Sequence, residues 1–288
     1  MASVIDSRPP TTVLVTGGTG NIGRELLRQL AERDDVHVRA ATRDPSGAAL
    51  PGAVEAVRAD LRRPDSLRSA LAGVTALFLV SQVGDDAGIL AAARRARVEH
   101  VVLVSSITVQ SHPHLGPAQD NAGVERRLET SGMDWTILRP TQFASNALWW
   151  ADSIRESRSV ELPFADVGLP TVDPADIAAV ARVALTEPGH RGRQYALTGP
   201  ARISPRRQID AIAAALGERI SITEIGRARA RERMVPQFGP RTADALLDVT
   251  GGDINEELLT VRDTVAEVTG SGARTFDDWV ARNVSAFR

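Results

Sequence analysis

The stretch VLVTGGTGNIGRELLRQL, residues 13–30, constrains the fold more than any other part of the chain. An apolar run leads into Gly17, Gly20 and Gly23, and a helical pattern follows at once. In such a strand–turn–helix the first glycine permits a tight turn, the second lets the backbone approach a pyrophosphate, and the third lets the helix pack on the sheet. The free N–H groups at the start of the helix favour an anion. The segment predicts a nucleotide-binding loop; the alternative is a tight turn without a ligand.

The rest of the first half repeats the same alternation of short apolar runs and helical patterns. The predicted strands are 13–16, 37–42, 54–58, 75–80, 101–105 and 135–138. The predicted helices between them are 22–32, 64–71, 87–97 and 118–130. Strands that are apolar throughout are typical of a parallel sheet covered on both faces. The sequence therefore predicts an α/β fold, a Rossmann-like doubly wound parallel sheet.

The pattern loosens after Pro140, which indicates a second, smaller part of the chain. Residues 141–157 look helical, 160–172 rich in loops, and 174–186 form a clear helix capped by Asp173. Further on, 194–197 and 220–224 are predicted to be short strands and 204–216 a helix. We expect a flexible lead over residues 1–11, a nucleotide-binding core over 12–140, and a mixed, discontinuous C-terminal substrate lobe over 141–288. Part of that lobe, about residues 172–200, should return to the core.

The end of the second predicted strand selects the nucleotide. An NAD-binding chain usually carries an acidic residue there for the ribose hydroxyls, whereas this strand runs into Arg43. A guanidinium can pair with a 2′-phosphate and stack on adenine, so Arg43 favours NADP(H). Asp44 is the complication, because it could pair with Arg43 or take a ribose hydroxyl. Asp60 and Leu61 follow the third strand, where adenine would lie, although Asp60 could equally cap the helix that begins at Pro64.

Composition excludes several chemistries. The chain has no cysteine and no lysine, and Tyr195 is its one tyrosine, so thiolate catalysis, Schiff bases and a tyrosine–lysine pair are excluded. The net charge of −2 gives no reason to expect nucleic acid or an anionic membrane as partner. No signal peptide or apolar run of membrane-spanning length is visible, so a cytoplasmic location is expected. No feature chooses between a monomer and a homodimer, and no metal site is expected.

Several short motifs, taken in order, resemble the NmrA-like branch of the atypical short-chain dehydrogenases/reductases. They are TGGTGNIG, TRDP after the second strand, ADL, SS after the fifth strand, SGMDWTILRP, VDPADIA and the terminal TFDDWVARN. The resemblance covers about residues 12–285 and implies a Rossmann core, NADP(H) as cofactor and a smaller substrate lobe. The family is similar to triphenylmethane-type and quinone reductases, and it also includes regulators that bind the nucleotide without turning it over.

The resemblance also assigns cofactor contacts residue by residue. It implies that the phosphate loop consists of Gly17, Gly18, Thr19, Gly20, Asn21, Ile22 and Gly23. It matches Arg43 to the arginine that holds the 2′-phosphate. Ser81 and Gln82 fall where the nicotinamide ribose usually rests, and Ser105 and Ser106 fall near the nicotinamide. Pro140 and Phe143, with Thr141, should pack against the nicotinamide end.

The departure from the family lies at its catalytic pair. The position of the family's lysine falls at Asn121, and no tyrosine stands near it. Hydride transfer is largely the cofactor's chemistry, and a strong proton donor is needed least for a quinone or another stabilised, conjugated acceptor. His112 and Ser106 are the candidate proton donors, with water as the alternative; His112 and His114 could equally be exposed loop residues.

An aromatic substrate pocket is predicted after the sixth strand. Its expected lining is Ser106, His112, Asn121, Phe143, Asn146, Trp149 and Trp150. The alternative for the tryptophans is that they pack the lobe onto the core. The arginine-rich segment 227–233 is expected to form a solvated helix face.

Three functions remain open at this point. The leading hypothesis is an NADPH-dependent reductase of a hydrophobic conjugated small molecule, quinone-like or of an aromatic polyketide type, as found in secondary metabolism. The second is a redox sensor that binds NADP(H) and a protein partner without turnover. The third is an isomerase or cyclising enzyme that keeps the nucleotide bound.

Overall fold

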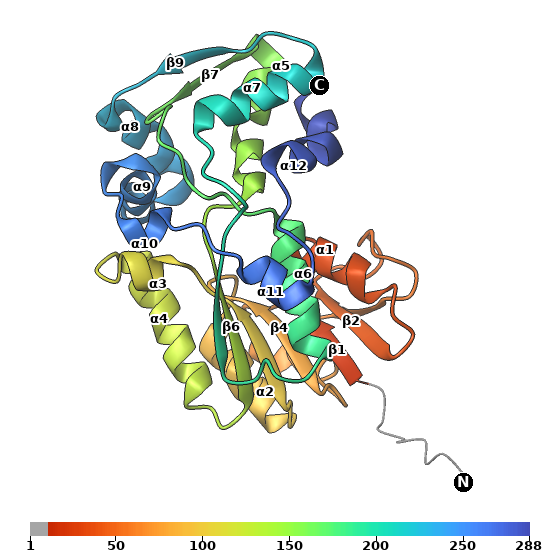
Figure 1. Cartoon of the computed structure of the whole chain (residues 1–288). Helices are drawn as coiled ribbons and strands as arrows, with labels where there is room; N and C mark the ends of the chain where they lie inside the picture. Colours follow the sequence, from red (N-terminus) through yellow and green to blue (C-terminus); the bar gives the residue numbers. More distant parts are fainter. Residues whose placement is uncertain (1–10) are drawn as a thin grey trace. The chain divides into compact units, whose positions relative to one another are not determined.

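The computed structural model describes residues 11–288, and its contacts group the chain into two compact units (Figure 1). The first unit comprises the chain up to Leu103, Arg127–Thr136 and Ala181–Arg193. The second comprises Val104–Arg126, Ile137–Val180 and Gln194–Arg288. The predicted lead over residues 1–11 lies outside the described residues except for Thr11, which begins the first strand. The predicted boundary at Pro140 stays a prediction beside this grouping.

A seven-stranded parallel sheet forms the Rossmann-like core, as the sequence predicted. Its order is β3-β2-β1-β4-β5-β6-β8, so the chain reverses direction across the sheet after β3. Its strands are β1 (Thr11–Val15), β2 (Val36–Thr42), β3 (Glu55–Arg58), β4 (Ala76–Val80), β5 (His100–Val104), β6 (Asp134–Pro140) and β8 (Arg193–Leu197). The pairs β1–β2, β1–β4 and β2–β3 are parallel, with Val13 beside both Val38 and Ala76. The carboxyl ends of these strands share one edge, where ligands of such sheets bind.

The first unit shows why its strands were legible in the sequence. Val13, Leu14 and Val15 are fully buried, as are Leu77 and Phe78 of β4. The helix α1 (Asn21–Leu30) buries one stripe against this layer through residues that recur at helical spacing. The other elements here are η1 (Pro64–Leu67), α2 (Asp86–Arg95) and, in part, α4 (Gly116–Glu129) and α6 (Pro174–Thr186). Asp85 caps α2 by accepting from the Gly88 amide at 3.0 Å.

The second unit contains a small parallel sheet of which the sequence predicted one strand, residues 220–224, but neither the other strand nor the pairing. β7 (Ser159–Leu162) pairs with β9 (Ser221–Glu224), although residues 160–172 had been predicted to be loop. Four-residue strands with one buried face lack the long apolar runs that identified the main sheet. Figure 1 shows this ribbon with α5 (Ala151–Ser157) and α7 (Pro205–Leu216). Their common core includes Ile154, Ile212 and Trp279.

The remaining helices of the second unit are short. They are α3 (Thr108–Ser111), η2 (Ala144–Trp150), α8 (Arg227–Phe238), α9 (Pro240–Leu247), η3 (Asp248–Gly252), α10 (Glu256–Leu259), α11 (Thr264–Thr269), α12 (Phe276–Asn283) and η4 (Val284–Phe287). The predicted helix 141–157 begins only at Ala144 and opens as a 3₁₀ helix, because Thr141 and Gln142 remain extended and bond Leu197 and Val172.

Two buried carboxylates anchor the C-terminal segment. Asp173 caps α6, accepting from the Ala175 amide at 2.8 Å, and also pairs with Arg282 of α12. Asp176 accepts from the Arg274 amide at 2.7 Å and pairs with its guanidinium. Burial raises the pKa of Asp176, while the bonds from Arg274 act in the opposite direction. Asp173 therefore caps α6, as the sequence predicted, and both aspartates anchor the C-terminal segment.

Candidate functional site

The glycine loop has the backbone geometry that its spacing predicted. Gly17 adopts a φ of +66°, and its carbonyl accepts from the Gly20 amide at 2.9 Å, which closes the turn. A Cβ on Gly23 would lie 2.2 Å from the Gly17 oxygen, so no side chain fits there. Gly20 caps α1 with no side-chain hydrogen bond, which leaves N–H groups of the first turn available. This arrangement fits the pyrophosphate of a dinucleotide.

A hollow in the first unit gathers the residues predicted for the adenosine half of the nucleotide. Its lining comes from the glycine loop, the ends of β2 and β3, and the segment after β4; the residues are Gly17, Thr19, Ala41, Thr42, Arg43, Asp44, Gly47, Ala48, Ala59, Asp60, Leu61, Arg62 and Val83. We call it the first-unit hollow. Five of the predicted cofactor residues, Gly17, Thr19, Arg43, Asp60 and Leu61, line it.

Arg43 is an exposed cation of this hollow, as is Arg62, and Asp44 is not the partner of Arg43. Arg43 is exposed and makes no ion pair within residues 11–288. Asp44 instead accepts from the Ser46 hydroxyl at 2.7 Å and the Ser46 amide at 3.2 Å. The Ser46 hydroxyl, then the Gly47 and Ser46 amides, hold the pKa of Asp44 below its usual value. The aspartate thus stabilises its own turn, and the guanidinium of Arg43 remains able to bind a phosphate.

The other predicted residues of the first unit are held mainly by backbone contacts. Asp60 accepts from the Arg62 amide at 3.0 Å, and the Leu61 carbonyl accepts from the Asp85 amide at 2.9 Å. Gln82 has a φ of +67°, and its amide donates to Asp86 at 2.8 Å. Ser81 and Gln82 follow β4 but do not line the first-unit hollow.

Ser105 and Pro140 end neighbouring strands and lie in the second unit. The Ser105 amide donates to Leu138 at 2.7 Å, and the Ile107 amide donates to Pro140 at 3.0 Å. The Ser105 hydroxyl is buried without a hydrogen-bond partner among the described residues. Such an orphaned group suits a ligand contact. Phe143 is half-buried and forms a β-bridge with Val172.

The two candidate proton donors lie in the segment around α3. His112 is fully buried: its Nε2 donates to the Asp253 carbonyl at 2.6 Å, and its Nδ1 accepts from the Ser111 hydroxyl at 2.8 Å. His114 is exposed. The Ser106 hydroxyl accepts from the Thr108 amide at 3.2 Å and from the Thr108 hydroxyl at 2.8 Å. His112 therefore has both ring nitrogens engaged, whereas Ser106 keeps its own hydrogen to donate.

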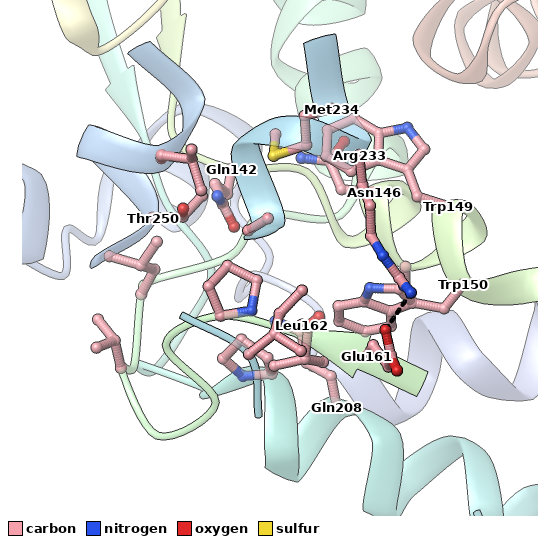
Figure 2. Close-up of a pocket in the computed structure, with 18 of the residues that line it drawn as sticks. Gln142, Asn146, Trp149, Trp150, Glu161, Leu162, Gln208, Arg233, Met234 and Thr250 are labelled. Carbon is pink, nitrogen blue, oxygen red and sulfur yellow. Dashed lines mark ion pairs between the residues drawn. The ribbon is translucent and has the colours of Figure 1, made fainter. Parts of the chain in front are cut away.

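The second unit contains a largely apolar pocket, and Figure 2 shows most of its lining. We call it the second-unit pocket; its hollow is about 1090 Å³, including the open side. Its residues are Gln142, Asn146, Ala147, Trp149, Trp150, Glu161, Leu162, Pro163, Val167, Leu169, Ile203, Pro205, Gln208, Ile225, Ala230, Arg233, Met234, Gln237, Phe238, Leu247 and Thr250. Of the predicted pocket residues, Asn146, Trp149 and Trp150 are present, while Ser106, His112, Asn121 and Phe143 are not among them.

Aromatic and amide groups define the character of this pocket. Trp149 is 48% exposed, and its ring centroid lies 5.3 Å from that of Phe238, at 58°. The side-chain amides of Gln142 and Asn146 make no hydrogen bond within residues 11–288. An apolar hollow with a few free polar groups is the usual form of a small-molecule site.

The sequence did not predict that residues of β7 and α8 line this pocket. Segment 227–233 was predicted to be a solvated face, yet Ala230 and Arg233 line the pocket, followed by Met234 and Phe238. The one available signal was the apolar content of residues 234–238 at the end of an arginine-rich helix. No group of three metal-ligating side chains and no helix able to cross a bilayer occurs in the part of the chain that the structure describes.

With this geometry in place, comparison with known proteins identifies the family. The family model described as NAD(P)H-binding matches residues 17–188, which include the glycine loop, Arg43 and the strands β2 to β6. The chain belongs to this NAD(P)H-binding family. It is an NAD(P)H-dependent oxidoreductase of the atypical short-chain dehydrogenase/reductase type, as the motifs indicated.

Three relatives illustrate the family. A (4-alkanoyl-5-oxo-2,5-dihydrofuran-3-yl)methyl phosphate reductase from Streptomyces griseus is 36% identical over 96% of this chain and 99% of its own length. An NAD(P)H azoreductase from Xenophilus azovorans is 34% identical over 96% and 99%. An NADPH-dependent quinone oxidoreductase from Escherichia coli is 26% identical, with a TM-score of 0.77 over 95% of this chain and 98% of its own. That enzyme has also been solved with NADPH.

Proposed function

We propose that this protein is a reductase that prefers NADPH to NADH and acts on a hydrophobic, conjugated acceptor of quinone-like or related aromatic type. The main support for this proposal is the second-unit pocket, whose tryptophans and free amides suit a flat molecule with ring oxygens or nitrogens. The Streptomyces relative is named as the reductase of an (alkanoyl-oxo-dihydrofuranyl)methyl phosphate and the Xenophilus relative as an azoreductase, which supports a conjugated acceptor.

The glycine loop and Arg43 would hold the nucleotide. The N–H groups of the first turn of α1 would bind the pyrophosphate, and Gly17 and Gly23 keep that space clear of side chains. Arg43 would bind the 2′-phosphate, because no carboxylate competes for its guanidinium. NADPH, when bound, supplies the hydride.

The residues of the second unit would orient the acceptor and supply the proton. Trp149 and Trp150 offer π-faces against which a conjugated ring can stack. Gln142 and Asn146 can donate to its oxygens or nitrogens. Ser106 or water, rather than His112, would provide the proton, because both ring nitrogens of His112 are engaged.

Oxidation of NADPH against a panel of quinones, azo compounds, enones and aromatic ketones tests the proposal. We expect turnover with at least one conjugated acceptor and none with simple aliphatic ketones, which need a stronger acid. Binding of NADPH and NADH is titrated on the same sample. Tight binding of NADPH with no turnover across the panel would contradict the reductase and favour the sensor.

A further inference from the structure

Only two charged side chains line the second-unit pocket, and they form an ion pair. Arg233 of α8 meets Glu161 of β7 through its Nη2, at the side of the pocket that Trp150 also lines (Figure 2). Every other lining residue is apolar or neutral. Among residues 11–288, Arg233 and Glu161 are therefore the lining side chains that can distinguish substrates by their charge.

The ion pair has an excess of positive charge. Glu161 also accepts from Nη2 of Arg229, at 3.3 Å to each carboxylate oxygen, so two guanidinium groups share one carboxylate. Elsewhere on α8 the ratio is one to one, since Arg227 pairs with Asp248 and Arg231 with Asp244. One positive charge therefore remains beside the pocket, and Glu232 of the same helix does not line it.

Arg233 also keeps hydrogen-bond donors for a ligand. A guanidinium carries five N–H groups, and among residues 11–288 the ion pair of Nη2 with Glu161 is the one polar interaction of Arg233. Its side chain is 53% exposed, so the ion pair with Glu161 is weak and can be rearranged. The two bidentate edges of a guanidinium are Nε with Nη2 and Nη1 with Nη2, and each uses a different hydrogen of Nη2. Glu161 contacts Nη2 alone, so one of these edges is left to bind a carboxylate, sulfonate or phosphate.

We propose that the conjugated acceptor carries an anionic substituent and that Arg233 binds it, with Glu161 limiting the strength of that contact. This rests on the proposed function, since it names the charge of the substrate for the same pocket. Arg233 is here a specificity-determining residue, and Trp149 and Trp150 would accept the ring regardless of charge.

The test compares two probes of similar shape, anthraquinone-2-sulfonate and 2-(hydroxymethyl)anthraquinone. Their affinities are measured by quenching of tryptophan fluorescence, without nucleotide. We expect the sulfonate to bind about tenfold more tightly at low salt and to lose this advantage as ionic strength rises. Arg233→Met should remove the advantage while the affinity of the neutral probe stays within about twofold. The control Arg231→Met, on the same helix but outside the pocket, should leave both affinities unchanged.

A second variant separates anion binding from a structural role. Glu161→Gln removes the competing carboxylate, so we expect it to tighten the sulfonate by about threefold. Damage to the fold would instead weaken both probes. Equal affinities of the two probes in the native protein, or equal losses in Arg233→Met, would overturn the proposal.

The binding assay also keeps this inference apart from the proposed function. A sulfonate preference in fluorescence without NADPH oxidation would leave the anion site standing and reject the reductase. Oxidation of NADPH by neutral quinones without any sulfonate preference would support the reductase and reject the anion site.

Discussion

The first-unit hollow and the second-unit pocket are built in different ways. The hollow is lined by short segments that follow successive strands, and its shape depends on backbone: a positive φ at Gly17, the absence of a Cβ at Gly23 and the turn at Asp44. The pocket draws side chains from residues between Gln142 and Thr250, contributed by η2, β7, α7, α8, α9, η3 and the loops between them. A site formed by backbone groups can be predicted from a short sequence motif. A site lined by side chains depends on contacts between segments that are far apart in the sequence. We therefore expect a single substitution to lower nucleotide affinity strongly in the hollow and to lower acceptor affinity only moderately in the pocket.

The largest expected effect is that of Gly23→Ala. The new Cβ would meet the Gly17 carbonyl oxygen at 2.2 Å and the Gly18 Cα at 2.9 Å, so the loop must open. We expect NADPH affinity to fall roughly 100-fold, since overpacking of this kind costs about 1–3 kcal/mol. Isothermal titration measures the affinity, and Gly52→Ala, where the Cβ meets nothing within 4 Å, is the matched control. Unchanged affinity in Gly23→Ala would show that the loop does not hold the nucleotide.

Replacing Arg43 tests the choice of nucleotide. Arg43→Gln should weaken NADPH about 30-fold, because a charge-assisted hydrogen bond to phosphate is lost, and NADH by less than about threefold. Competitive titration of the two nucleotides gives both constants. Arg63→Gln, an exposed arginine outside the hollow, serves as the control. Similar losses for NADPH and NADH would mean that Arg43 does not bind the 2′-phosphate.

Trp149→Ala should act on the acceptor and leave the nucleotide alone. Loss of the exposed ring, and of its contact with Phe238, should raise KM for aromatic acceptors about tenfold. The dissociation constant of NADPH should not change. Val261→Ala, a 40% exposed apolar residue outside the pocket, is the control. An unchanged KM would remove Trp149 from the substrate site.

The smallest expected effect on activity is that of His112→Gln. Glutamine can still donate to the Asp253 carbonyl, so we expect kcat within about twofold and a loss of stability of about 1 kcal/mol. Steady-state kinetics and urea unfolding measure the two quantities. Were His112 the proton donor that the sequence suggested, kcat would fall by about 100-fold or more.

The sequence predicted one of these regions far better than the other. The strands β1, β4 and β5 were the easiest to predict because Val13–Val15 and the matching residues of β4 and β5 are buried on both faces, and five predicted cofactor residues line one hollow. The strand 220–224 was predicted, but β7 and its pairing with β9 were missed because that pairing joins residues about 60 positions apart with little apolar periodicity. His112 and Asn146 illustrate the same limit. Both are polar residues near strand ends, yet one lies buried with both nitrogens bonded and the other lines a pocket, and only packing decides between them.

A single-turnover experiment shows directly whether NADPH transfers its hydride to a conjugated acceptor bound by this protein. The protein, in excess over NADPH, is mixed without oxygen with increasing 1,4-naphthoquinone while the absorbance of the reduced nicotinamide is followed. We expect a single-exponential loss of that absorbance whose rate saturates with quinone, because a bound acceptor receives the hydride without a tyrosine–lysine pair. The proposed reductase activity would be contradicted if the absorbance stayed constant while NADPH was demonstrably bound, both with this quinone and with its anionic sulfonate.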